Sequence, residues 1–233
     1  MPKPHPATIA FHQALLEQYG DSLRLLLELP ATRSMRVRTL ALFATLATQL
    51  PASVSDLAKY TGLTPTEISS ATLRMRNGLG WLALEKTGGK RGSGRIILTD
   101  VGQALLQSYH GAFKDLGFDE YRYPGNGGRK PSARAVLEDI CTLADETTLL
   151  GLFDLACLLI GLHNMREMAR FSCRSHGAPF LVVRTFYNMG LVEVENPESQ
   201  RQTYRLTTKG LHLLGGMFYL VDQALTATDG ETQ

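Results

Sequence analysis

Apolar residues recur at every third or fourth position in several segments of the chain, which is the spacing of amphipathic α-helices. Thr64, Pro65 and Glu67 mark the start of one segment, because a hydroxyl cap, a proline and an acid suit the free amides of a first turn. Segments 81–98 and 191–206 each contain two short strands around a glycine-rich or polar tip, and predict β-hairpins. The predicted helices cover 7–29, 38–50, 57–60, 64–77, 99–106, 132–145, 149–162, 165–171, 179–188 and 207–225. These segments predict a mainly α fold with two small β-hairpins.

One short motif occurs twice in the chain. The pattern L-T-x-x-G-x-x-L-L covers 98–106 and again 206–214. Upstream of the two copies, 80–85 matches 190–195, and 56–60 matches 167–171, in the same order along the chain. The sequence therefore predicts an internal repeat. Each copy has the order helix, helix–turn–helix, β-hairpin, helix.

A segment rich in proline and glycine separates the two copies. Two prolines and three glycines lie within 123–131, which predicts a linker over 115–134. The domains expected on either side are 1–114, with its core at 38–106, and 135–233, with its core at 149–214. The first includes an N-terminal packing helix and the second a C-terminal packing helix. The polar tail after Leu225 is expected to be frayed.

Each copy resembles a MarR-type winged helix–turn–helix DNA-binding protein. The resemblance is carried by the helix–turn–helix, the Gly190-Leu191-Val192 strand start, the polar or basic wing and the L-T-x-x-G-x-x-L-L motif, over 53–106 and 164–214. In the first copy the turn 77–80 is one residue out of step with the family spacing. MarR proteins carry one such module per chain and dimerise through terminal helices. The resemblance therefore implies a tandem arrangement, as a monomeric pseudo-dimer or a homodimer, with a small-molecule effector between the terminal helices and the modules.

The first module has the side chains that a DNA reader needs. A recognition helix in the major groove needs one apolar face for its own core and another of small polar and cationic groups. A wing that follows the phosphate backbone needs cations on a flexible tip. Over 53–98 the charge balance is +4. The candidate residues are Thr66, Ser69, Ser70, Arg74 and Arg76 on helix 64–77, and Lys90, Arg91 and Arg95 on the wing 86–95.

The second module is a poorer match to these requirements. Its recognition helix, 179–188, is apolar nearly all round, which is typical of a buried helix or an interface. The balance over 164–206 is only +2, and the wing carries Glu198. Its candidate phosphate contacts are Arg174, Arg184 and Arg201.

Composition and charge narrow the class of protein. Apolar residues make up 44% and charged residues 20% of the chain, which is typical of a globular protein. The N-terminus lacks the apolar core of a signal peptide, and the longest apolar run, 149–162, is too short to span a bilayer. The three cysteines form no CxxC pair. These features predict a cytoplasmic protein without a membrane partner.

The sequence predicts a sequence-specific protein that binds double-stranded DNA, a transcriptional repressor. The half 1–117 has a balance of +5 and the half 118–233 a balance of −3, so a polyanion should prefer the first half. The alternatives are a plasmid or phage replication or partition protein, and a tandem winged-helix adaptor that binds proteins without DNA.

Phosphate-loop, zinc-protease and nucleophile-elbow motifs are missing from the sequence, so neither catalysis nor a cofactor or metal is expected.

Overall fold

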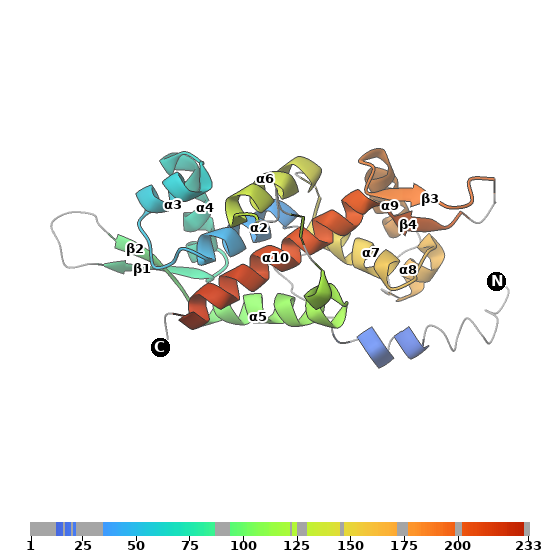
Figure 1. The fold of residues 1–233 in the computed structure, drawn as a ribbon, viewed down its shortest axis with the longest axis horizontal. Coiled ribbons are helices and arrows are strands. Elements are labelled where there is room, and N and C mark those ends of the chain that lie inside the picture. Colours follow the sequence, from blue (N-terminus) through green and yellow to red (C-terminus); the bar gives the residue numbers. More distant parts are fainter. Residues whose placement is uncertain are drawn as a thin grey trace. The chain divides into compact units, whose positions relative to one another are not determined.

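The computed structural model of the 233-residue chain is mainly helical and has two small antiparallel sheets of two strands each (Figure 1). This confirms the coarse fold class predicted from the sequence. The elements are α2 (Val37–Ala47), α3 (Val54–Thr61), α4 (Pro65–Asn77), β1 (Leu82–Lys86), β2 (Gly94–Leu98), α5 (Asp100–Asp115), the 3-10 helix η1 (Phe118–Glu120), α6 (Ala133–Ala144), α7 (Leu149–Leu159), α8 (Met165–Phe171), α9 (Gly177–Asn188), β3 (Val192–Val194), β4 (Tyr204–Leu206) and α10 (Thr208–Gly230). The structure describes residues 13–15, 17–19, 21, 35–86, 94–121, 123–124, 130–144, 147–171, 177–198 and 202–230.

Contacts divide the chain into two compact units, and each contains one copy of the repeat. The first-copy unit comprises 36–110, 122–145 and 216–233. The second-copy unit comprises 1–35, 111–121 and 146–215. Helix α6 belongs to the first-copy unit and packs on α2, although it follows the predicted linker in the sequence.

The sequence predicts a helix near the start of the chain and a frayed tail at its end, and the structure bears on both. The predicted helix 7–29 is helical at 13–15, 17–19 and 21, and its other residues lie outside the described ranges. The expectation of a frayed tail after Leu225 is wrong, because α10 continues to Gly230. Leu220, Val221 and Ala224 are fully buried on one side of α10, and this packing anchors its last turns.

The core of the first-copy unit forms around α2. Phe43 of this helix is buried, and its ring centroid lies 4.8 Å from that of Trp81, which is also buried. The sequence favours core packing over base stacking for Trp81, and the structure confirms it. Ala52 and Ile96 exchange two backbone hydrogen bonds, of 3.1 and 2.7 Å, so the chain entering α3 is tied to the second strand of the hairpin.

The second-copy unit repeats this tie with one change. Tyr204 donates its amide to the carbonyl of His163 at 2.7 Å. The second hydrogen bond comes from a side chain instead of a backbone amide. The Nδ1 of His163 lies 3.0 Å from the carbonyl oxygen of Tyr204, and it is the donor because a carbonyl oxygen can only accept. The capping of the following helix is also repeated. Asn164 accepts from the amide of Glu167 at 2.9 Å, as Ser53 accepts from the amide of Asp56 at 3.2 Å.

The L-T-x-x-G motif builds the same junction in both units. In the first copy the Thr99 hydroxyl donates to the carbonyl of Gly80 at 2.6 Å and accepts from the amide of Gly102 at 3.1 Å. It thereby caps α5 and fixes that helix to the turn before β1. Any side chain at position 102 would place its Cβ 2.3 Å from the carbonyl oxygen of Trp81, so the close approach requires glycine.

The second copy repeats each of these contacts. The Thr207 hydroxyl donates to the carbonyl of Gly190 at 2.7 Å and accepts from the amide of Gly210 at 3.3 Å. A Cβ at position 210 would lie 2.3 Å from the carbonyl oxygen of Leu191. The repeated motif therefore holds the closing helix of each copy against the turn that starts the hairpin.

Candidate nucleic-acid interface

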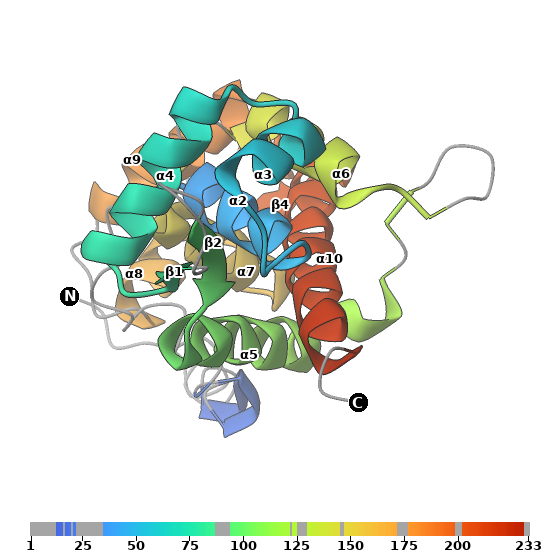
Figure 2. The same cartoon turned by 90° about the vertical axis from the view of Figure 1, so that its left-hand side faces the viewer.

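Helix α4 is set by strong local signals. Thr64 accepts from the amide of Glu67 at 3.3 Å, and the Glu67 carboxylate accepts from the amide of Thr64 at 2.8 Å, which completes a capping box. The hydrogen bonds from the Thr64 hydroxyl and then from its amide hold the pKa of Glu67 below its usual value. Helix α4 packs on α3 and β1, and in Figure 2 it lies to the left of α2, with α6 to the right.

Two faces of α4 differ sharply in polarity. The spacing of apolar residues predicts an inner face of Ile68, Ala71 or Thr72, and Met75. Ile68, Thr72 and Met75 are buried, so this inner face is confirmed. The exposed residues at positions 66, 70, 73 and 77 follow one another at helical spacing along the opposite face. All the predicted base-contacting residues lie on this side or at its margins. Thr66, Ser69, Ser70 and Arg74 are exposed, and Arg76 is partly buried.

The two arginines of α4 lie on opposite margins of the exposed face. Arg74 borders Ser70 and Asn77, whereas Arg76 lies beside the buried Thr72. Between them, at the centre of the face, is Leu73, which is 50% exposed. The sequence reasoning missed Leu73. Its polar neighbours at positions three and four residues away were the available signal.

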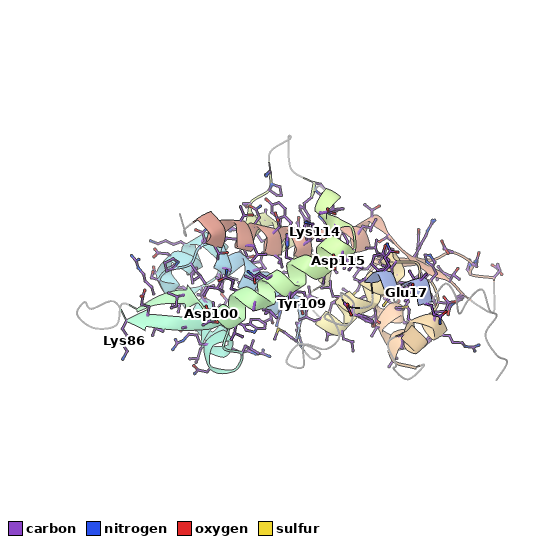
Figure 3. All side chains as sticks on the ribbon, turned by 90° about the horizontal axis from the view of Figure 1, so that it is seen from below. Glu17, Lys86, Asp100, Tyr109, Lys114 and Asp115 are labelled. Atoms are coloured by element: carbon purple, nitrogen blue, oxygen red, sulfur yellow. The ribbon has the colours of Figure 1, made fainter. Side chains whose placement is uncertain are left out.

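The described part of the β1–β2 hairpin contains two exposed cations, Arg95 and Lys86. Arg95 is exposed, but it lies directly opposite Glu85 in the strand register. Lys86, which was not singled out from the sequence, is exposed at the end of β1, away from the helices (Figure 3). Lys90 and Arg91 lie outside the described residues. The described part of the hairpin therefore contributes the exposed Lys86, while Arg95 lies near two acids, Glu85 opposite it in the register and Asp56 of α3.

A hollow lies between the start of β2 and the segment that connects α2 to α3. It is lined by Gln49, Pro51, Ala52, Ser53, Asp56, Gly94 and Arg95. Its one carboxylate, that of Asp56, accepts a 2.6 Å hydrogen bond from the Ser53 hydroxyl. That bond is the main cause of the lowered pKa of Asp56, to which nearby Lys59 and Arg95 also contribute. Since Asp56 is ionised and already partnered, the hollow offers no strong attraction for an anion.

In the second-copy unit, α9 takes the place that α4 has in the first. Pro179, Val183 and Phe186 are buried. Arg184, predicted as a phosphate contact, is exposed, whereas Arg174 and Arg201 lie outside the described residues. Helix α9 is thus buried along one face only, and its exposed residues include three large apolar side chains, those of Phe180, Leu181 and Tyr187.

The second hairpin has little charge to offer a polyanion. Arg205 on β4 forms an ion pair with Glu193, which lies opposite it on β3. Glu198, at the described edge of the tip, is exposed. The charge of Arg205 is therefore neutralised by direct contact with Glu193. The described part of β1–β2 has no such ion pair.

Two further features bear on the kind of site. Among the described residues, no group of three or more histidine, cysteine, aspartate or glutamate side chains could hold a metal ion. In the same part of the chain, no helix combines the length and the apolar character needed to cross a membrane.

A scan against protein-family models matches no family, and comparisons with curated proteins and with solved structures find no match.

Proposed function

We propose that the chain is a sequence-specific double-stranded DNA-binding protein, a transcriptional repressor, in which α4 enters the major groove. One observation carries the proposal. The outer face of α4 combines small hydroxyl side chains with an exposed arginine, over an inner face that is fully committed to the core. Such a face can donate and accept hydrogen bonds at base edges without disturbing the fold.

The proposal includes two winged helix–turn–helix modules in one chain. The repeated element order and the repeated Thr–Gly junctions support it. In each module the hairpin would be the wing, and Lys86 would approach the phosphate backbone beside the groove that holds α4. The first module is the DNA reader in this proposal, because the hydroxyl groups and the free cations gather there.

Selection of bound fragments from randomised duplex DNA, followed by a salt titration, tests this function. We expect one sequence family to be enriched. The logarithm of its binding constant should fall linearly with the logarithm of salt concentration, with a slope that reports several phosphate contacts. Failure to enrich any sequence, together with no measurable duplex binding at low salt, would contradict the proposal and favour a protein-binding adaptor.

Leu73 gives this proposal a testable detail at the base level. An apolar side chain at the centre of a groove-facing surface is suited to contact the C5-methyl group of thymine. Replacing the contacted thymine of the selected site with deoxyuridine removes only that methyl group. We expect affinity to fall about three- to fivefold, from the roughly 0.8 kcal/mol of burying one such carbon, as measured by fluorescence anisotropy.

The variant Leu73→Ser should bind the thymine and deoxyuridine duplexes equally well. Leu84→Ser, which changes an exposed leucine of β1, is the matched control and should keep the preference for thymine. If wild-type protein does not distinguish the two duplexes at any thymine of the site, then Leu73 does not contact a methyl group.

A further inference from the structure

Helices α4 and α9 can be aligned residue by residue from their buried positions. Ile68, Thr72 and Met75 are buried in α4, and Pro179, Val183 and Phe186 are buried at the same spacing in α9. The turns that follow agree with this alignment. The amide of Trp81 donates to the carbonyl of Met75 at 3.0 Å, and the amide of Leu191 donates to the carbonyl of Phe186 at 2.9 Å.

With this alignment the outer faces of the two helices have inverted polarity. Leu73 at the centre of the α4 face corresponds to Arg184 in α9, and Ser69 and Ser70 correspond to Phe180 and Leu181. In α4 an apolar residue is surrounded by polar ones. In α9 a cation has three apolar neighbours, because Phe180, Leu181 and Tyr187 lie three or four positions from Arg184. The fourth neighbour, Asn188, corresponds to Asn77 of α4 and is polar in both helices.

The apolar side chains of α9 are exposed to an unusual degree. Phe180 is 46%, Leu181 66% and Tyr187 53% exposed. Within the described ranges, only three other large apolar side chains are similarly exposed, and they lie on α4, β1 and α5: Leu73, Leu84 and Val101. A cluster of this kind, in contrast to scattered single residues, marks an interaction surface.

Arg184 determines which occupant fits this surface. No carboxylate among the described residues pairs with it. A partner that covers Phe180, Leu181 and Tyr187 would remove water from the guanidinium, so it must supply an acceptor of negative charge. A carboxylate held among apolar groups meets both requirements, since it can pair with the guanidinium in a charge-assisted, bidentate hydrogen bond.

Two other occupants fit less well. In a symmetric contact between two copies of α9, the central residue would meet its own counterpart, and two arginines would face each other. A DNA duplex would neutralise Arg184, but it would cover Phe180 and Leu181 with polar base edges or hydrated phosphates. At the corresponding positions of α4 the residues are Ser69 and Ser70, which suit such polar groups.

We propose that the outer face of α9, formed by Phe180, Leu181, Arg184 and Tyr187, binds a segment of another protein that presents a carboxylate among apolar side chains. Aromatic and arginine side chains are the residues that dominate binding energy at such interfaces. This proposal does not depend on DNA binding by α4, because it concerns a different helix in the other unit.

A display library of short helical peptides, randomised on one face, provides the probe. Selection against the full chain should enrich peptides that carry an aspartate or glutamate within an apolar face. Binding of an enriched peptide, measured by fluorescence anisotropy, should weaken about tenfold or more in Phe180→Ser/Leu181→Ser, the change that installs the two serines of α4. Val101→Ser on α5 removes another exposed apolar side chain and should leave binding unchanged.

A charge exchange tests the role of Arg184 directly. Arg184→Glu should bind the enriched peptide at least about tenfold more weakly. It should also bind more tightly a peptide in which lysine replaces the central acid. These substitutions are at exposed positions, and an unchanged circular dichroism melting curve shows that each variant is folded.

Several results would overturn the proposal. One is a selection that enriches no acidic apolar face, and another is peptide binding that survives both the serine pair and Arg184→Glu. Self-association lost only in Phe180→Ser/Leu181→Ser would show that the occupant is a second copy. Duplex binding lost in that variant but kept in Val101→Ser would show that it is DNA.

Discussion

Replacing Arg74 with alanine should weaken binding to the selected duplex by about 1–3 kcal/mol, the largest loss expected for a single residue of α4. Arg74 is exposed beside Ser70 and Asn77, so its guanidinium can reach a base edge from the outer face. A bidentate contact to guanine requires the planar fork of arginine. Arg74→Lys should therefore keep part of the affinity and lose much of the specificity.

Arg76→Ala is the matched comparison for this experiment. Arg76 is partly buried at the other margin of α4, so its removal should cost less affinity than removal of Arg74. Competition titrations with the selected duplex and with a scrambled duplex measure both quantities. Equal affinity of wild-type protein and Arg74→Ala for the selected duplex would remove this face of α4 from the DNA interface.

Gly102→Ala should destabilise the first-copy unit by about 1–3 kcal/mol, the usual cost of forcing an extra methyl group into a packed site. The new Cβ would lie 2.3 Å from the carbonyl oxygen of Trp81, which already accepts a 3.1 Å hydrogen bond from the amide of Thr99. Because the obstacle is backbone, it cannot rotate away as a side chain could. Urea denaturation followed by circular dichroism measures the effect.

Gly111→Ala, on the same helix, separates this clash from helix propensity. A Cβ at position 111 meets no atom within 4 Å, so alanine there should stabilise the protein by up to about 1 kcal/mol. Gly210→Ala should act like Gly102→Ala, because its Cβ would lie 2.3 Å from the carbonyl oxygen of Leu191. If Gly102→Ala stabilised the protein as Gly111→Ala is expected to do, then the close approach at position 102 would not exist in solution.

Sequence patterns predicted most of the fold because its signals are local. The Thr64–Glu67 capping box, the cap at Ser53 and the inner face of α4 all depend on residues within a few positions of one another. The two copies differ in length at two turns. The first has one extra residue between α4 and β1, and two more within its hairpin. Turns accept such insertions because the buried positions on either side keep their spacing.

The candidate site was predicted less completely. The polar residues of α4 could be chosen from the sequence, but the margins on which Arg74 and Arg76 lie depend on which face packs against α3 and β1. Similarly, Arg95 counts as a wing cation in the sequence, while the strand register places it opposite Glu85. Pairing across strands joins residues far apart in sequence, so charge counts along the chain could not detect it.

By itself the sequence determined the order of the helices and hairpins, the presence of two copies and the chemical character of their helix faces, because each is encoded by spacing and composition within one segment. Only the tertiary structure decided which apolar residues of α9 are buried and which are exposed, since that depends on packing against elements elsewhere in the chain. It also explains why each copy of the motif contains its threonine and, three residues later, its glycine. Those residues bond to or approach the backbone of a turn that lies 17 to 21 residues earlier in the chain.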